Sequence, residues 1–296
     1  AMHSNMWLAP ATQANVATLR ERGVHVIDPE SGALGSGDSG IGRLPAPEEI
    51  ARRALAILGG SEPAAVGTSL AGKTVVVTAG GTREPIDPVR FLGNKSSGRQ
   101  GMAIAAAAAR AGARVRVIAA NIDDSVMAFL PSSVEVTRVG SAQQMREATL
   151  AQVGGADALV MTAAVADFRP EATQASKMKK DPTTSDAPTL RLVRNPDILS
   201  EIGHGPHRPP LVVGFAAETG TDEEILAYGA DKAARKGADY IALNRVGTGV
   251  GFGDVPNDIR LLDAAGHIVG RYTGSKDEVA AGLIGQVAAF LDNLER

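Results

Sequence analysis

The sequence predicts an α/β fold: a Rossmann-like, doubly wound and mostly parallel sheet with a C-terminal β-hairpin and helix. Three observations support this prediction. From Lys73 onward, apolar strand-like runs alternate with helix-like segments, which is typical of a parallel sheet covered on both faces. The first of these runs leads into the pair Gly80-Gly81, where nucleotide-binding sheets place their turn. Near the C-terminus, the turn sequence 263–266 separates two apolar runs, as in a hairpin.

The expected elements follow the apolar pattern along the chain. We expect strands at 74–77, 115–119, 134–139, 158–162, 211–215, 240–243, 259–262 and 268–271. We expect helices at 98–111, 141–152, 222–236 and 276–294, with Ser141 as the N-cap of the second. Alanine fills much of the first helix, so this helix can pack closely against the sheet.

The first 66 residues do not have the pattern of a complete domain. Residues 24–27 could form one strand, and residues 48–58 predict a helix with a periodic apolar face. The stretch 31–42 is rich in glycine and is interpreted as a flexible loop. We therefore expect an N-terminal piece over 1–58, a linker over 59–71 and an α/β domain over 72–296.

The composition favours a cytoplasmic protein and excludes several classes of site. The 296 residues include no cysteine, so disulfides, thiolate metal sites and cysteine nucleophiles are excluded. The net charge is −3 with both signs interspersed, which argues against a nucleic-acid or membrane-surface partner. No apolar run approaches the roughly 18 residues that a membrane span needs, and the first residues do not resemble a signal peptide.

The turn after the first strand of the α/β body is the most informative motif. In a dinucleotide-binding fold the helix begins within a few residues of the strand, whereas here a long polar stretch precedes it. Its polar residues are Thr82, Arg83, Glu84, Asp87, Arg90, Asn94, Lys95, Ser96 and Ser97. A loop this long at the carboxyl edge of a parallel strand is a place for binding and catalysis, so the sequence favours an enzyme.

Two motifs in this region allow a functional and a structural interpretation. Gly80 and Gly81 could let backbone amides approach a phosphate, or could only form a tight turn. In the run 94–99, Ser96 or Ser97 could cap the following helix. The free N–H groups of the same helix terminus could instead face an anion.

Two further motifs are equally ambiguous when taken alone. The small residues of 162–168 could admit a flat ring beside Asp167, or could simply pack closely in a turn. The basic run 177–180 could be solvated surface, or a mobile flap over a triphosphate.

The last two motifs lie nearer the C-terminus. The run Asn195-Pro196-Asp197-Ile198 could be a helix start with a capping asparagine and a proline in the first turn. Lys232 and Lys236 lie four residues apart on one predicted helix face, which follows the strand-end turn 215–219. A solvated face and a pair of phosphate-binding lysines both fit this spacing.

Together these motifs resemble phosphopantothenoylcysteine synthetase, the ligase of the coenzyme A pathway. The resemblance covers roughly 72–296 and rests on TAGGTREPIDPVRFLGNKSSG, AAVADFRP, KMKK, RNPDIL, VGFAAET and the lysine pair, all in the family's order. It implies that the carboxylate of 4′-phosphopantothenate attacks the α-phosphate of CTP and expels pyrophosphate. The amine of L-cysteine then attacks the acyl-cytidylate and releases CMP, with Mg²⁺ bridging the phosphates.

The resemblance also implies roles for individual residues. Asn94 would be the catalytic residue that contacts the acyl-cytidylate, and Arg90 beside it would orient the pantothenate end. The residues expected to bind CTP are Gly80, Gly81, Met161, Thr162, Ala163, Asp167, Phe168, Lys177, Asn195, Pro196, Asp197, Ile198, Phe215, Lys232 and Lys236. Family resemblance further suggests a homodimer joined through sheet or hairpin edges, with the hairpin 259–269 as one candidate.

The N-terminal piece is similar to the tail of the flavin-dependent phosphopantothenoylcysteine decarboxylase. The resemblance rests on the segments 2–7 and 37–43. His3 stands where the motif has asparagine, and Ser36 stands where the family has its catalytic cysteine. Most of the decarboxylase's sheet is missing from this chain, so we expect decarboxylation and FMN binding only in a full-length parent.

Two other classes of protein remain as alternatives. An NAD(P)-dependent oxidoreductase would need a compact GxGxxG turn, which is absent, and an acidic residue after the second strand of the body. Asp123 or Asp124 would have to serve there. A nucleotide sensor without catalysis would not need the polar cluster between Thr82 and Ser97.

Overall fold

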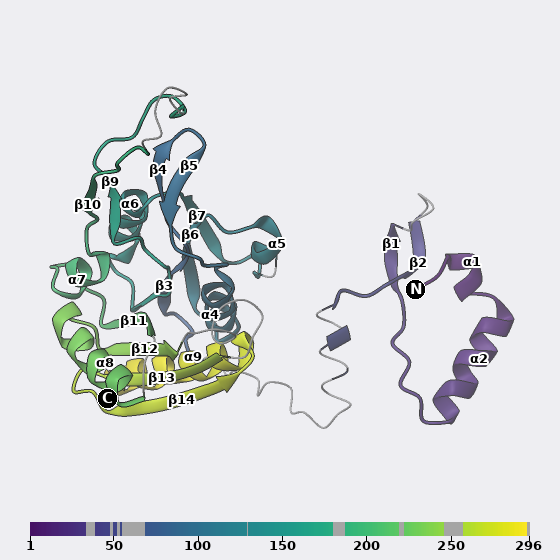
Figure 1. Cartoon of the computed structure of the whole chain (residues 1–296). Helices are drawn as coiled ribbons and strands as arrows, with labels where there is room; N and C mark the ends of the chain where they lie inside the picture. The colour runs from purple at the N-terminus through teal and green to yellow at the C-terminus, as the bar shows by residue number, and fades with distance from the viewer. Residues whose placement is uncertain are drawn as a thin grey trace. The chain divides into compact units, whose positions relative to one another are not determined.

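The computed structural model describes residues 1–33, 39–47, 50–51, 54, 69–128, 130–179, 187–218, 222–245 and 257–294. The chain divides into two compact units, Ala1–Gly67 and Thr68–Arg296 (Figure 1). The first unit contains α1 (Ser4–Trp7), α2 (Pro10–Glu21) and an antiparallel hairpin of β1 (Glu30–Ala33) and β2 (Ser39–Arg43).

Sequence reasoning was least successful in this first unit. The predicted strand at 24–27 is wrong, because residues 24–29 form no regular element and pairing begins only where β2 supplies a partner. Both ends of the glycine-rich stretch belong to the hairpin, while its middle lies outside the described residues. Most of the predicted helix at 48–58 also lies outside the described residues. Helix α2, which begins with Pro10 at its first position, was not predicted.

The second unit is built on one large sheet. Its eight strands among the described residues lie in the order β14-β13-β12-β11-β8-β3-β6-β7. The strands are β3 (Thr74–Gly80), β6 (Arg114–Ala120), β7 (Glu135–Val139), β8 (Ala158–Met161), β11 (Leu211–Glu218), β12 (Tyr240–Arg245), β13 (Asn257–Asp263) and β14 (Ile268–Gly274). All pairings from β12 to β7 in this order are parallel. Strand β13 pairs antiparallel with both β12 and β14.

This sheet confirms the predicted fold class. Each of the eight predicted strands corresponds to one strand of the sheet, with ends that differ by a few residues. Successive strands run outward from β3 to β6 and β7, and then from β8 to β11 and β12 on the other side. The strand order therefore reverses between β3 and β8, as in a doubly wound fold.

Helices cover both faces of the sheet. Helices α4 (Arg99–Arg110) and α9 (Lys276–Leu294) pack against each other over one face. Helices α6 (Ala142–Val153), α7 (Ile198–Gly203) and α8 (Asp222–Lys236) cover the other face, and α5 (Asp124–Met127) is a single turn of helix after β6. All but one of the alanines of α4 are buried, and Ser141 is the N-cap of α6, both as predicted; Ser141 forms a capping box with Gln144.

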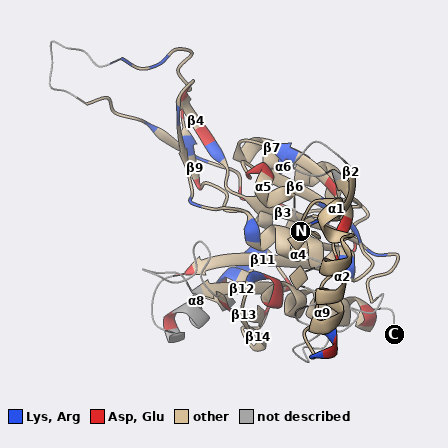
Figure 2. Cartoon of the chain, turned by 90° about the vertical axis from the view of Figure 1, so that its right-hand side faces the viewer, with Lys and Arg blue, Asp and Glu red and all other residues tan. Residues whose placement is uncertain are grey.

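The long polar turn after β3 has a structure that the sequence did not predict. It folds into a hairpin of β4 (Arg83–Asp87) and β5 (Arg90–Gly93), while β9 (Phe168–Pro170) pairs with β10 (Leu192–Arg194) in a second ribbon. The two ribbons are in contact and stand out from the layers of the sheet (Figures 1 and 2). We call residues 83–93, 168–179 and 187–194 the arm.

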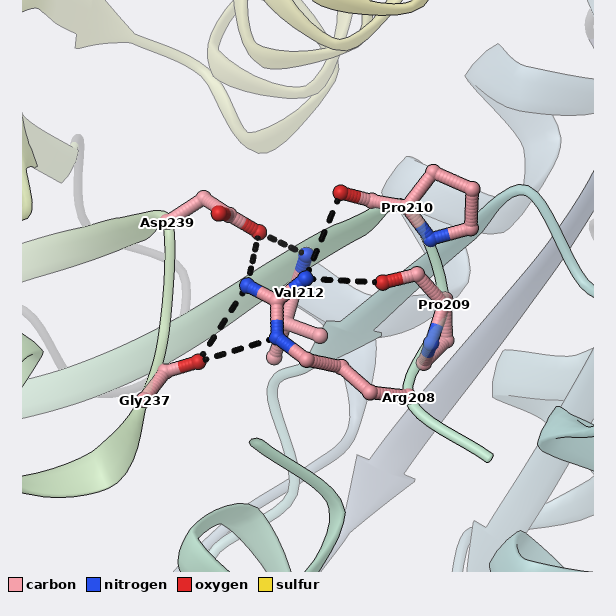
Figure 3. Close-up of polar contacts among 6 residues, drawn as sticks. All are labelled: Arg208, Pro209, Pro210, Val212, Gly237 and Asp239. Carbon is pink, nitrogen blue, oxygen red and sulfur yellow. Dashed lines mark hydrogen bonds and ion pairs between the residues drawn. The ribbon is translucent and has the colours of Figure 1, made fainter. Parts of the chain in front are cut away.

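An ion-pair network lies at the amino ends of the parallel strands, opposite the edge of the sheet where the arm begins. Asp239, just before β12, accepts hydrogen bonds from Arg208 (Nη2, 2.7 Å) and from the backbone N–H of Val212 (2.7 Å). The guanidinium of Arg208 also donates to the carbonyls of Gly237, Pro209 and Pro210 (Figure 3). One partly buried carboxylate thus joins the loops that precede β11 and β12.

Replacing Asp239 with alanine should lower the free energy of unfolding by about 1–3 kcal/mol, because the Val212 N–H loses its acceptor and the Arg208 guanidinium loses its carboxylate partner. Equilibrium denaturation in urea measures this loss. Asp124→Ala is the matched control, because its ion pair with Arg138 is exposed and should contribute little. Equal stabilities of the two variants would show that the Asp239 network does not stabilise the edge.

Candidate functional site

A cavity of about 460 Å³ opens at the carboxyl edge of the parallel strands. It is lined by 94–101, 162–165, Asp167 and 215–217, together with Lys232, Asn244, Asn257 and Lys276. These residues come from the β3–α4 connection, from the ends of β8, β11 and β12, and from the starts of β13 and α9. The cavity therefore lies where the strand order reverses, which is where doubly wound sheets bind their ligands.

The floor of the cavity is a seam of hydrogen bonds that extends the β3–β8 pairing. The backbone N–H and the hydroxyl of Thr162 both donate to the Thr78 carbonyl, at 3.1 and 2.6 Å. Ala164 then donates to Gly80 and accepts from the N–H of Thr82. The Thr82 hydroxyl, which is buried, accepts from the N–H of Ala166 (3.0 Å). The turn after β8 is thus fixed to the chain that leaves β3.

Helix α4 begins at the cavity wall and approaches the seam closely. A Cβ at Gly101 would lie 2.5 Å from the Ala79 Cβ and 2.4 Å from the Thr162 hydroxyl, so only glycine fits there without movement. The N-cap is Gly98, in a left-handed conformation (φ +76°), and no side chain caps the helix. The expected cap by Ser96 or Ser97 is therefore wrong. Among the described residues no side chain caps α4, and the first turn of this helix lines the cavity.

Six of the residues predicted to bind or act on substrate line the cavity. They are Asn94, Thr162, Ala163, Asp167, Phe215 and Lys232. The side-chain amide of Asn94 donates to the Val165 carbonyl (3.2 Å), which holds Asn94 against the turn after β8. Lys232 on α8 forms an ion pair with Glu218 at the end of β11, with 3.4 Å between Nζ and Oε1. These motifs are distant in sequence and come together only through the strand order.

Four predicted nucleotide contacts lie in the protein interior or below the seam. Gly80 and Gly81 are buried, and a Cβ at Gly80 would lie 2.0 Å from the Ala120 carbonyl oxygen. Met161 and Ile198 belong to a hydrophobic cluster with residues of β3, β6 and α7. None of the four is among the residues that line the cavity.

The run Asn195–Ile198 has a structural role of its own. Its asparagine does not cap α7: the amide of Asn195 donates to the Ala166 carbonyl (2.8 Å), and Asp197 caps the helix by accepting from the Ser200 N–H. Asp197 also forms an ion pair with Lys236. Burial would raise the pKa of Asp197, but the hydrogen bonds from Lys236 and from the Ser200 N–H, together with the charges of Lys236 and Arg235, outweigh it and lower that pKa. Asn195, Pro196, Asp197 and Lys236 lie outside the cavity lining.

Three predicted residues lie on the arm instead of in the cavity: Arg90, Phe168 and Lys177. Arg90 donates to the carboxylate of Asp87 (2.9 Å from Nε) and to the Met178 carbonyl (2.6 Å). Asp87, which is buried, also accepts from the N–H groups of Val89, Arg90 and Met178. The segment that contains Lys177 is thereby tied to the β4–β5 turn.

Sequence reasoning missed four polar residues that line the cavity: Gln100, Asn244, Asn257 and Lys276. Asn257 donates to the Gln100 side chain (2.6 Å) and accepts from Lys276 Nζ (3.5 Å). The side-chain oxygen of Asn244 is buried and has no hydrogen-bond partner within the described part of the chain. The sequence does contain a signal for three of them, because Asn244 lies at the end of a predicted strand and Asn257 and Lys276 lie next to predicted elements. It was overlooked because the antiparallel hairpin was considered only as an edge.

The described residues offer neither a cluster of metal ligands nor a membrane-spanning helix. No group of three or more histidine, aspartate or glutamate side chains among them could hold a metal ion. Asp167 is the acidic residue of the cavity lining. Within the same residues, none of the helices is both long and apolar enough to span a bilayer.

The fold and cavity define the class: a doubly wound α/β protein whose ligand site lies at the reversal of strand order. The model of the DNA/pantothenate metabolism flavoprotein C-terminal domain matches residues 70–291, and the flavoprotein model matches residues 1–58. A bifunctional coenzyme A biosynthesis protein, CoaBC of Mycobacterium bovis, is 45% identical over 98% of this chain and 69% of its own length. The Bacillus subtilis protein of the same description is 38% identical over 98% and 68%.

The chain belongs to this family of bifunctional coenzyme A biosynthesis proteins, and residues 70–291 correspond to its synthetase domain. A crystal structure of the C-terminal domain of a CoaBC protein is 31% identical, with a TM-score of 0.61 over 77% of this chain and all of that one. A DNA/pantothenate metabolism flavoprotein from Streptococcus pneumoniae is 21% identical, with a TM-score of 0.60 over 74% and 99%. At that identity the second likeness shows the fold alone.

The carboxylate of Asp87 should make the stability of the arm depend on pH. Burial alone would raise the pKa of Asp87, but the hydrogen bonds from Val89, Met178 and Arg90 hold it at about 2, below its ordinary 3.8. A lowered pKa stabilises the fold above the ordinary value, and this stabilisation is lost as the pH falls toward 2. Wild type should therefore unfold at a higher temperature than Asp87→Asn at pH 7, and the difference should shrink on acidification.

Thermal unfolding of both proteins between pH 7 and pH 2 measures that difference, with the exposed Asp124→Asn as the control substitution. A difference that stays constant over the whole range would contradict the role given to Asp87.

Proposed function

We propose that this chain is a cytoplasmic ligase of coenzyme A biosynthesis that joins 4′-phosphopantothenate to L-cysteine at the expense of CTP. The observation that supports this most directly is the composition of the cavity. Asn94, Asp167 and Lys232 come from three separate motifs of the synthetase family, and all three line one cavity at the reversal of strand order. The names of the relatives, bifunctional coenzyme A biosynthesis proteins, point to the same pathway.

In the first step, the carboxylate of phosphopantothenate would attack the α-phosphate of CTP and pyrophosphate would leave. A carboxylate is already a nucleophile at neutral pH, so the protein needs charge neutralisation and alignment rather than a covalent group. Lys232 and the uncapped first turn of α4 supply positive charge at the cavity. The buried seam beneath them keeps these groups in fixed positions.

The nucleoside would lie over the turn after β8. The N–H groups of Thr162 and Ala163 donate to Thr78, but their backbone carbonyls can accept from the cytosine amine. Phe215 can pack against the face of the ring, and Asp167 can accept from a ribose hydroxyl or the ring amine. The buried, unpartnered oxygen of Asn244, unpaired within the described residues, adds a further acceptor for a ligand N–H or O–H. Met161, Asn195, Pro196 and Ile198 would act by supporting this turn from behind.

Magnesium would be held chiefly by the phosphates, with Asp167 as the available carboxylate of the cavity. Mg²⁺ keeps several waters and commonly uses one or two carboxylates together with substrate phosphates, which fits this donor set. When bound, the ion would neutralise charge on the triphosphate. The arm residues Arg90, Phe168 and Lys177 would join the site when the arm approaches the nucleotide, and Lys236 would remain paired with Asp197.

In the second step, the amine of L-cysteine would attack the acyl-cytidylate, forming the amide and releasing CMP. We assign Asn94 to this step, because its amide is held against Val165 at the mouth of the β3–α4 connection. The N-terminal unit would be the end of a flavin-dependent decarboxylase domain over 1–58, joined by a linker over 59–71. FMN would then bind only in a full-length parent.

The nucleotide is tested by calorimetry with CTP, ATP, UTP and NADH, each with Mg²⁺. CTP should bind most tightly, and its addition with 4′-phosphopantothenate should release pyrophosphate before any cysteine is present. Preference for ATP would overturn the cytidine assignment alone. Tight binding of NADH without CTP would favour an oxidoreductase, and CTP binding without pyrophosphate release would favour a sensor.

The same assay separates the two steps through Asn94. Asn94→Ala should still release pyrophosphate but should form the amide at least about 100-fold more slowly, since it loses one oriented polar group at the reacting centre. Asn293→Ala on the exposed end of α9 is the control and should leave both steps unchanged. Amide formation at the wild-type rate would remove the role proposed for Asn94.

We further propose a homodimer that forms through the arm. Exposed apolar side chains gather there: Val89, Phe91, Leu92, Phe168, Leu190 and Leu192. Such a patch on a projecting element is typical of a protein interface. The edge strand β14, which the sequence suggested as a candidate edge, exposes one large apolar side chain, Ile268, among its described residues.

The mass of the protein in solution, measured by light scattering over a dilution series, should be that of a dimer. Leu192→Glu should shift it toward the monomer, because a charge would be buried in the interface, whereas Ile268→Glu on β14 should not. The opposite result would move the interface from the arm to the edge strand.

A further inference from the structure

We propose that Lys276 binds the terminal phosphate of the nucleoside triphosphate and so holds the pyrophosphate that leaves in the first step. This inference rests on the proposed function and adds a residue that none of the family motifs contains. Lys276 is the first residue of α9, and its side chain lines the cavity from the β13–β14 side.

Lys276 is held in position by two side-chain amides. Its Nζ lies 3.5 Å from the Oδ1 of Asn257, which is buried at the start of β13. Asn257 donates to the side chain of Gln100 at 2.6 Å, and Gln100 donates to the backbone carbonyl of Lys276 at 3.3 Å. This closed set of contacts joins the first turns of α4 and α9, so the ammonium group has a defined place beside the uncapped end of α4.

Among the described residues, Lys276 differs from Lys232 and Lys236 in how far its charge is neutralised. Lys232 is paired with Glu218 and Lys236 with Asp197, so each already has a carboxylate partner. Within the described residues, the contact recorded for the ammonium of Lys276 is the neutral Asn257 amide. Burial and the nearby guanidinium of Arg99 lower the pKa of Lys276, as expected for a cation that lacks a counter-anion. An anionic ligand would supply the missing charge.

The strand order identifies which part of the ligand this anion would be. The nucleoside is proposed at the end of β8, and β13 lies three strands further along the sheet in the order β8-β11-β12-β13. Three strand spacings separate the two ends of the cavity by roughly 14 Å. A triphosphate that starts over Thr162 and Phe215 and passes the first turn of α4 would therefore place its last phosphate nearest Lys276.

The test compares ligands that differ only in their phosphates. Lys276→Met should weaken CTP binding roughly 10- to 100-fold, because a charge-assisted contact to phosphate is lost. CMP, which lacks the terminal phosphates, should bind both proteins equally well. Lys276→Arg should recover most of the CTP affinity. Arg271→Met, which removes an exposed cation from β14, serves as the matched control and should change neither ligand.

Equal weakening of CTP and CMP would overturn the inference, because it would indicate a general loss of the site. An unchanged CTP affinity in Lys276→Met would overturn it as well. Inorganic tripolyphosphate separates this inference from the proposed function, since its binding to wild type and its loss in Lys276→Met do not depend on the base. Should wild type prefer another nucleotide to CTP, the cytidine assignment fails while the tripolyphosphate result still decides the role of Lys276.

Discussion

The hydrogen-bonded seam between the chain leaving β3 and the chain leaving β8 is the constraint on which the rest of the site depends. Two parallel strands normally separate beyond the sheet, yet here pairing continues through Ala164, Thr82 and Ala166. The seam joins the two strands at the switch point, and residues 162–165 on one side of it line the cavity. Because Thr82 and Ala164 are bound to each other, the arm on one chain and the nucleotide turn on the other start from one rigid junction.

The arm extends from that junction and carries three of the predicted site residues, Arg90, Phe168 and Lys177. Asp87 accepts four hydrogen bonds, three from the β4–β5 turn and one from the N–H of Met178. The segment containing Lys177 is therefore attached to the β4–β5 hairpin and should move with it. Arg90 is committed to the same contact, which explains why it does not line the cavity. If the arm approaches the nucleotide, as proposed, then movement of the whole arm, and not of Arg90 alone, would bring Arg90 and Lys177 to the site.

The sheet could be predicted because its strands appear in the sequence as short runs rich in apolar residues. This pattern can be recognised without knowledge of the tertiary structure. The arm could not be predicted, because Arg83–Gly93 lacks an apolar alternation and is stabilised by distant partners such as Met178. The cap of α4 was misjudged for a similar reason: Ser96 and Ser97 are good caps locally, but the close approach of α4 to Ala79 and Ile122 selects glycine at 98 and 101. Asn257 and Lys276 were missed because the strand order that brings them to the cavity was not predicted, and the hairpin was considered only as an edge.

The cations around the cavity differ in how far their charge is already neutralised, and this gradation orders their proposed roles. Lys236 is bound to Asp197 and fixes α7 beneath the nucleoside turn. Lys232 has a looser contact with Glu218, so it can exchange that carboxylate for a phosphate at modest cost. The ammonium of Lys276 contacts the Asn257 amide among the described residues and lies near the Arg99 guanidinium, so it has more to gain from an anion than Lys232 or Lys236. Charge that is left uncompensated in the free protein is best placed where the leaving group acquires negative charge, because stabilisation there lowers the barrier to the first step.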